Sequence, residues 1–413
     1  MNRASNGILR QDYKRFWNSP NTGGHVLRAV FGTESRFITR IYLQRAIVLS
    51  LVTIAIVVAL DVSINVERFM SDEKIAQQQK GLLDLLKYAV LRVSFVAPSV
   101  LFFAGVWGIV WAEHSLSISR ERIMIFNCGR SYLPSLIPAL LVGAIIGALH
   151  FVSTAYVRPA TIEIEAKTTH RNYSPSFHRP SVTDPTWISG RDFILHTRIE
   201  FAPQQIGLKE ASLYSFDEKG ELRTIVNAAR AVPTGKTGTW RFTTGTVWNF
   251  ATSGQNPQIG RPAISEQPFE SLDFGMALST RWLEYFELEP ELIPHPQLLA
   301  IVAHGDHVPN LYKYEMAVQE RYASIVYCIS TILLSAFLAF VVFDPNMMPY
   351  RALGVALVGF GAFFLYSISL MLGRFGYQPV FIAAWIIPLA ALASFIGIAF
   401  WHSARVNSLM RSE

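Results

Sequence analysis

The sequence predicts an α-helical membrane protein with six transmembrane helices, three on each side of an inserted all-β periplasmic domain of jelly-roll type. Six apolar runs are long enough to cross a membrane, and a polar segment with β-type alternation separates the third from the fourth. Only 16% of the residues are charged, against about 25% in an average soluble domain. The modest mean hydropathy of +0.29 fits a chain with both lipid-embedded and aqueous parts.

The first apolar run covers residues 46–60 and is extended on both sides, which satisfies the need for about 20 residues across the hydrocarbon core. Five further runs of suitable length lie at residues 88–111, 133–156, 322–343, 350–372 and 379–401. The first 45 residues are polar and lack the apolar region of a secretory signal. We therefore expect the first helix to stay uncleaved.

Basic residues near the helix ends predict the orientation, because cytoplasmic loops carry an excess of Lys and Arg. With the N-terminus inside, the cytoplasmic flanks hold ten basic residues: Arg28, Arg36, Arg40, Arg45, Arg120, Arg122, Arg130, Arg351, Arg405 and Arg411. The outer flanks hold five: Arg68, Lys74, Lys80, Lys87 and Arg374. This ratio predicts cytoplasmic termini in a multi-pass inner-membrane protein. It also accounts for the net charge of +6 without a nucleic-acid partner.

The polar insert reads as β-structure. Residues 192–201 alternate, with one face predicted to be buried and formed by Phe193, Leu195, Thr197, Ile199 and Phe201. Residues 211–216 and 222–231 predict two strands joined by a turn in which Gly220 takes the left-handed position. Residues 239–250 add another strand, anchored by Trp240 and Trp248. A sandwich or jelly roll follows from this pattern.

These elements divide the chain into five parts. Residues 1–35 form a cytoplasmic N-terminal tail, and residues 36–158 hold the first three spans with a short cytoplasmic helix near residues 117–130. Residues 159–296 form the periplasmic β-domain, and residues 297–321 return the chain to the membrane. Residues 322–413 hold the last three spans and a short cytoplasmic tail.

Motifs that carry chemistry are scarce. Gly235-Lys236-Thr237 matches the end of a P-loop, but Arg230 stands where the first glycine is required, so a plain β-turn is the better interpretation. His304 and His307 have no further ligands close in sequence, which favours a loop over a metal site. We expect neither a cofactor nor an enzymatic activity.

The segment between the second and third spans is more informative. Residues 119–130 place Ile123, Phe126 and Asn127 on one helical face, and Gly129 is a C-terminal stop. Such a short amphipathic helix either lies on the lipid headgroups or docks on a soluble partner. The pattern alone does not separate the two.

Several features of the chain resemble the LptF/LptG permease family. They are Glu121 followed eight residues later by Gly129, Arg158-Pro159 after the third span, the strand-like stretch around Leu213-Tyr214-Ser215-Phe216-Asp217, and the order Leu298-Leu299, Gly305, Tyr314, Arg321 before the fourth span. The resemblance covers residues 36–405 and is closer to LptG-like members. Arg120 departs from the family pattern, because it separates Ser119 from Glu121.

The resemblance implies a permease subunit of an ABC exporter that extracts lipopolysaccharide from the inner membrane and passes it to a periplasmic β-jelly-roll bridge. The implied partners are a second homologous permease, a cytoplasmic ABC ATPase dimer, a single-span bridge component and lipopolysaccharide. It makes the short helix a coupling helix, with Glu121, Arg122, Phe126 and Gly129 as candidate ATPase contacts.

Charges near the outer membrane surface are candidate lipid contacts. Asp61 and Arg68 lie on one stripe of the first helix, and Arg92 lies inside the second. The resemblance favours Arg68 as a lipid ligand, and Arg92 and Arg374 are further candidates. Snorkelling of Arg68 to headgroups, or an Asp61–Arg68 pair, is the simpler alternative.

Two other functions stay open at the level of sequence. A membrane-anchored sensor could bind a periplasmic ligand with the β-domain, although such a protein normally has a cytoplasmic output domain. A permease for another lipid or for lipoproteins would share the same layout. An intramembrane enzyme fits least, because the spans hold no cluster of His, Asp or Glu at helical spacing.

Overall fold

The computed structural model describes residues 32–71, 81–127, 134–167, 182–201, 205–235, 238–250, 264–286, 288–303, 305, 308–342 and 349–412. The chain forms two compact units, and each is described by itself. The first comprises residues 1–153, 322–371 and 382–413; the second comprises residues 154–321 and 372–381.

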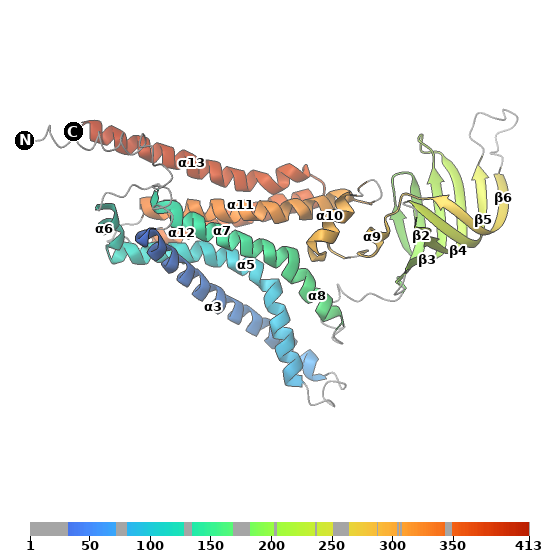
Figure 1. Ribbon diagram of the computed structural model, residues 1–413, viewed down its shortest axis with the longest axis horizontal. Coiled ribbons are helices and arrows are strands. Elements are labelled where there is room, and N and C mark those ends of the chain that lie inside the picture. The colour runs from blue at the N-terminus through green and yellow to red at the C-terminus, as the bar shows by residue number, and fades with distance from the viewer. Residues whose placement is uncertain are drawn as a thin grey trace, which may run out of the picture. The chain divides into compact units, whose positions relative to one another are not determined.

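Among the described residues, six helices are long and apolar enough to span a membrane, which confirms the predicted number. The helices that contain the spans are α3 (Thr33–Ser71), α5 (Gly81–Ile118), α7 (Ile137–Val152), α11 (Leu311–Val342), α12 (Pro349–Arg374) and α13 (Val380–Ser412). A π-helical turn at Ser153–Val157 continues α7 into α8 (Arg158–Lys167). Helix α5 is visibly bent (Figure 1) and carries Pro98 in its interior, where proline removes a backbone hydrogen bond.

Glycines bring the helices of the first unit close together. A Cβ at Gly108 of α5 would lie 2.8 Å from the Ala46 backbone of α3. A Cβ at Gly143 of α7 would lie 3.0 Å from Ile329 Cα of α11. Such close backbone approach at small residues is how membrane helices gain packing energy without a hydrophobic driving force.

In the described part of the second unit, six strands form an antiparallel sheet in the order β1-β2-β3-β4-β5-β6 (Figure 1). Its strands are β1 (Thr186–Ser189), β2 (Phe193–Phe201), β3 (Ile206–Phe216), β4 (Leu222–Pro233), β5 (Thr239–Phe250) and β6 (Ile264–Gly275). The inserted β-domain is thus confirmed, and β1 and β6 add to the strands predicted from sequence. The described strands form a meander, so a jelly-roll topology is not confirmed.

The predicted alternation of β2 is confirmed, since Phe193, Leu195, Thr197 and Ile199 are buried. The turn after β3 is confirmed as well: Gly220 has φ +80°, and the Asp217 carboxylate accepts hydrogen bonds from the next backbone amides. Gly235 also has a left-handed φ, which fits a hairpin turn; Lys236 and Thr237 lie outside the described residues.

The sheet has irregular positions in its inner strands. Glu210 in β3 and Thr244 in β5 both have φ 52° and are left out of the pairing with β4, although the register on either side stays the same. The buried positions of β5 change phase across Thr244, from Trp240 and Phe242 to Val247. The register itself shifts where β2 pairs with β3, between His196 and Arg198.

Short helices close the core of the second unit. They are α9 (Thr280–Leu283), η4 (Pro290–Leu292) and α10 (His295–Ala303), and their apolar side chains join the buried face of the sheet. Trp282 donates its indole N–H to the Tyr314 hydroxyl at 2.6 Å, which ties α9 to the start of α11. His304, Asp306 and His307, the residues of the possible metal motif, lie outside the described residues.

Candidate functional site

A sharp corner joins α5 to the short helix α6 (Glu121–Asn127). Arg120 occupies this corner with φ 61°, a left-handed conformation that side chains seldom adopt. Its carbonyl oxygen accepts a hydrogen bond from the Met124 amide and so begins the new helix. The predicted short helix near residues 117–130 is present, while Gly129 lies outside the described residues.

Arg122 of α6 is buried, with only 4% of its surface exposed. Its guanidinium forms an ion pair with Glu113 of α5, in which Nε donates to Oε2 at 2.9 Å. Its Nη2 also donates to the Tyr42 hydroxyl of α3 at 3.1 Å, and Tyr42 in turn donates to Glu113. We call Tyr42, Glu113 and Arg122 the buried triad, because it joins three helices.

The environment of the triad keeps the arginine charged. Burial lowers the pKa of Arg122, but the neighbouring Tyr42 and Glu113 outweigh it, and the resulting pKa lies above the ordinary value of arginine. Its guanidinium also lies over the Phe340 ring at 4.5 Å, and Phe126 meets Phe340 edge-on. The inner face of α6 is therefore held by one buried charge and two aromatic rings.

The opposite face of α6 is apolar and exposed. Ile123 is 41% exposed and Met124 is 62% exposed. A seven-residue helix that is anchored on one side and presents apolar side chains on the other has the form of a docking element. Of the candidate contacts, Glu121 is available beside this face, whereas Arg122 and Phe126 point inward.

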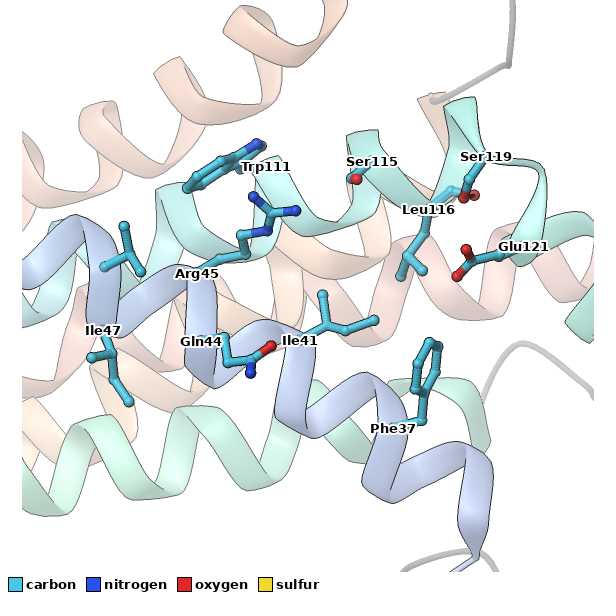
Figure 2. Close-up of a pocket in the computed structure, with 11 residues that line it drawn as sticks. Phe37, Ile41, Gln44, Arg45, Ile47, Trp111, Ser115, Leu116, Ser119 and Glu121 are labelled. Atoms are coloured by element: carbon cyan, nitrogen blue, oxygen red, sulfur yellow. Dashed lines mark hydrogen bonds between the residues drawn. The ribbon is translucent and has the colours of Figure 1, made fainter.

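Glu121 also lies at one end of a groove of about 670 Å³ between α3 and α5 (Figure 2). Phe37 and Leu116 line this end, and Arg45 lies toward the other. The Arg45 guanidinium stacks on the Trp111 ring, 4.1 Å from its centroid. This Arg–Trp pair lies where both apolar runs begin or end, as interfacial anchors do.

The charges near the other end of α3 pair between helices. The Asp61 carboxylate accepts from Arg92 Nε at 3.0 Å and from the Tyr88 hydroxyl at 2.7 Å. Both partners belong to α5, so Arg92 holds α5 against α3. The side chain of Arg68 lies outside the described residues, although its backbone continues α3.

Arg374 belongs to an ion-pair network of the second unit. Its guanidinium pairs with Glu291 of η4 and with Glu320 of α11, the latter at 2.7 Å. Arg158 of α8 reaches the same Glu291 at 3.3 Å. This network fastens the segment around η4 to three helices, and Arg374 is engaged by two carboxylates within it.

A second arginine supports the same segment through backbone contacts. Arg321 donates to the carbonyl oxygens of Glu291 at 3.0 Å and Ile293 at 2.8 Å. The neighbouring His295 is buried, and burial together with the Arg321 charge lowers the pKa of its imidazole. His295 is therefore held neutral near pH 7.

Among the described residues, no group of three or more His, Cys, Asp or Glu side chains could hold a metal ion. Sequence reasoning missed Tyr42 and Glu113, although a Glu just past the end of an apolar run could have marked a buried partner for a nearby Arg. The best-formed polar site in the first unit is thus the triad behind α6.

Comparison with known proteins identifies the family. The family model described as lipopolysaccharide export system permease LptF/LptG matches residues 36–402, which hold all six spans and the β-domain. No curated protein matches the chain. The chain therefore belongs to the LptF/LptG family of lipopolysaccharide export permeases, which are non-catalytic, multi-pass transport subunits of the inner membrane.

Proposed function

We propose that this protein is the permease subunit that takes lipopolysaccharide from the outer leaflet of the inner membrane and passes it to a periplasmic bridge. A second homologous permease would complete the transport cavity, and two copies of a cytoplasmic ABC ATPase would drive its closure. The observation that supports this proposal best is α6, a short helix anchored inward by Arg122 with Ile123 and Met124 exposed.

We propose that α6 docks on the ATPase. Its exposed apolar pair would fill a hydrophobic groove of the partner, and Glu121 would meet a basic residue at the rim. Phe126 and Arg122 would hold the helix in place from behind, and Gly129 would end it. An interfacial helix on lipid headgroups, the competing interpretation, has no need for a buried charge that fixes its orientation.

The test is copurification of the ATPase with Glu121→Lys. We expect less ATPase to be recovered while the permease still inserts and pairs, because the reversed charge opposes the rim contact. Glu284→Lys is the control, since it makes the same charge reversal at an exposed glutamate of the other unit. Equal ATPase recovery and equal coupled hydrolysis for both variants would contradict the docking proposal.

We propose that both termini are cytoplasmic and the β-domain is periplasmic, on the basis of the distribution of basic residues. In a chain without its native cysteines, Ser271→Cys on exposed β6 should react with a membrane-impermeant thiol reagent added from outside. Ser119→Cys, which is exposed beside α6, should react only after the membrane is opened. The reverse pattern would invert the topology.

The β-domain offers an edge for the bridge component. Within the described strands, β6 pairs on one side with β5 only, and its side chains are mostly exposed. We propose that a strand of the bridge adds to this edge, as extended segments do at open sheet edges.

For the lipid itself we propose Arg68 as the phosphate contact, whereas Arg92 and Arg374 serve mainly in ion pairs.

We also propose that the chain occupies the LptG-like position of the two permease positions, because it resembles LptG-like members more closely. Copurification addresses it directly, because the sister permease recovered in the complex would be LptF-like. Recovery of neither an ATPase nor a sister permease would favour a sensor or a different exporter.

A further inference from the structure

We propose that Tyr42, Glu113 and Arg122 transmit movement of α6 to α3 and α5, so that the buried triad couples the ATPase to the transport cavity. We treat them as positioning residues, since all three are buried behind the exposed face of α6. The inference rests on the proposed docking of α6 and assigns to the triad a role in transport that docking alone does not require.

The triad is a polar link that joins α6 to two spans, α5 and α3. Arg122 stands in the middle of the link: it bonds to Glu113 on α5 and to Tyr42 on α3, and Tyr42 bonds to Glu113. Each of the three side chains therefore has two partners on two other helices. A displacement of α6 cannot leave α3 in place without breaking at least one charge-assisted hydrogen bond.

Helix α3 receives the link near its first turns. The triad engages α3 at Tyr42, which is completely buried and nine residues from the first residue of the helix. Farther along α3, the Ala46 backbone packs against Gly108 of α5, and Asp61 pairs with Arg92 of α5. Helices α3 and α5 are therefore joined along their length, so a displacement passed on by the triad reaches both spans together.

Stability alone gives a weaker account of the triad. Replacing a buried ion pair with apolar residues of similar volume is often neutral or stabilising, so a purely structural role does not call for charge here. A charged, hydrogen-bonded triad differs from an apolar contact in one respect: each hydrogen bond fixes both the distance and the angle between the side chains. Such bonds make the three helices move together, whereas apolar side chains can slide past one another. The two accounts therefore differ in what an apolar replacement should do.

The experiment uses the full complex of permease, sister permease and ATPase in proteoliposomes that contain lipopolysaccharide. The variants are Tyr42→Phe, Arg122→Lys, and the triple replacement Tyr42→Phe, Glu113→Leu, Arg122→Met. ATPase recovery, ATP hydrolysis and lipopolysaccharide released per ATP are measured on the same preparations.

Because Arg122 also holds α6 in place from behind, each variant is compared at the amount of ATPase that it retains, and the lipopolysaccharide released is expressed per ATP hydrolysed. The triple replacement should lower the lipopolysaccharide released per ATP by about fivefold or more, the lower range for energetic coupling between sites. Arg122→Lys, which keeps the charge and part of the hydrogen bonding, should recover part of this loss. Tyr42→Phe should give an intermediate loss.

Three outcomes overturn the inference. If the triple replacement folds and transports with wild-type yield per ATP, the triad transmits nothing. If transport falls only in proportion to lost ATPase, the triad serves docking alone. If all variants, including Arg122→Lys, lose transport in proportion to the amount of folded permease that is lost, the role of the triad is structural. Failure of the wild-type permease to bind any ATPase would instead refute the proposed function.

Discussion

Removing the negative charge of the triad should destabilise the protein strongly. Glu113→Gln keeps the shape of the side chain but leaves the Arg122 guanidinium, which is 4% exposed, without a counter-charge. Breaking a buried ion pair in this way typically costs about 3 to 5 kcal/mol. The new amide also points a donor group toward the guanidinium, and two donors cannot form a hydrogen bond.

The triple replacement of the triad by Phe, Leu and Met gives the matched comparison. It removes every polar member together, and apolar replacement of a buried pair is often neutral to stabilising. We expect its free energy of unfolding to lie within about 1 kcal/mol of the wild type.

The assay is unfolding of the purified full-length permease in mild detergent by titration with sodium dodecyl sulfate, followed by tryptophan fluorescence. A loss below about 1 kcal/mol for Glu113→Gln would refute the reasoning, because an exposed pair contributes no more than that. So would a triple variant less stable than Glu113→Gln, since the energy would then come from shape and not from charge.

Three further predictions concern other parts of the chain. Gly245→Ala should destabilise the β-domain by about 1 to 3 kcal/mol, because the new Cβ would lie 2.0 Å from the Asn227 carbonyl oxygen. Gly275→Ala is the control, since a Cβ there meets no atom within 4 Å and should leave thermal unfolding unchanged. The hydrogen bond from the Lys209 ammonium lowers the pKa of the Glu200 carboxylate. The wild type should therefore be more stable than Glu200→Gln above the ordinary carboxylate pKa, and this difference should vanish as the pH falls through the pKa of the folded state. Unfolding measured over a pH series checks this expectation. Arg68→Glu should impair growth far more than Arg68→Lys, because it reverses a charge-assisted contact worth about 1.5 to 3 kcal/mol. A photoreactive probe placed at position 68 in a separate strain should capture lipopolysaccharide; normal growth of Arg68→Glu together with no crosslink would make Arg68 a simple anchor.

The spans and the inner strands follow from local pattern. Apolar length predicts the membrane helices, because lipid tolerates few charges over such a distance. Period-two alternation predicts β2, and a glycine at the left-handed position predicts the turn at Gly220. In each case the determining interaction lies within a few residues, so the sequence displays it directly.

Strand β6 and the left-handed positions of the sheet could not be predicted in the same way. The segment Ile264–Gly275 is mostly exposed and contains Pro268, so it lacks the alternation and composition of an inner strand. Glu210 and Thr244 take the left-handed backbone although no glycine marks these positions. These features arise because paired strands must keep register across a bent sheet, which is a property of several segments together.

The candidate site shows the same limit. Helical spacing placed Ile123 and Phe126 on one face, but Ile123 is 41% exposed and the buried neighbour is Arg122. The partners that bury Arg122 are nine and eighty residues away in the sequence. A charged residue on a short helix is ordinarily assigned to the solvent side, and only the fold reveals a counter-charge behind it.

The most direct test of the account is a photoreactive amino acid at position 124, compared with one at position 51, in cells that depend on this permease. Met124 and Leu51 are almost equally exposed, at 62% and 63%, but one lies on α6 and the other in the first span. We predict a crosslink to the cytoplasmic ATPase from position 124 and none from position 51. A probe at position 124 that captures only lipid would contradict the central claim that α6 couples this permease to an ATPase.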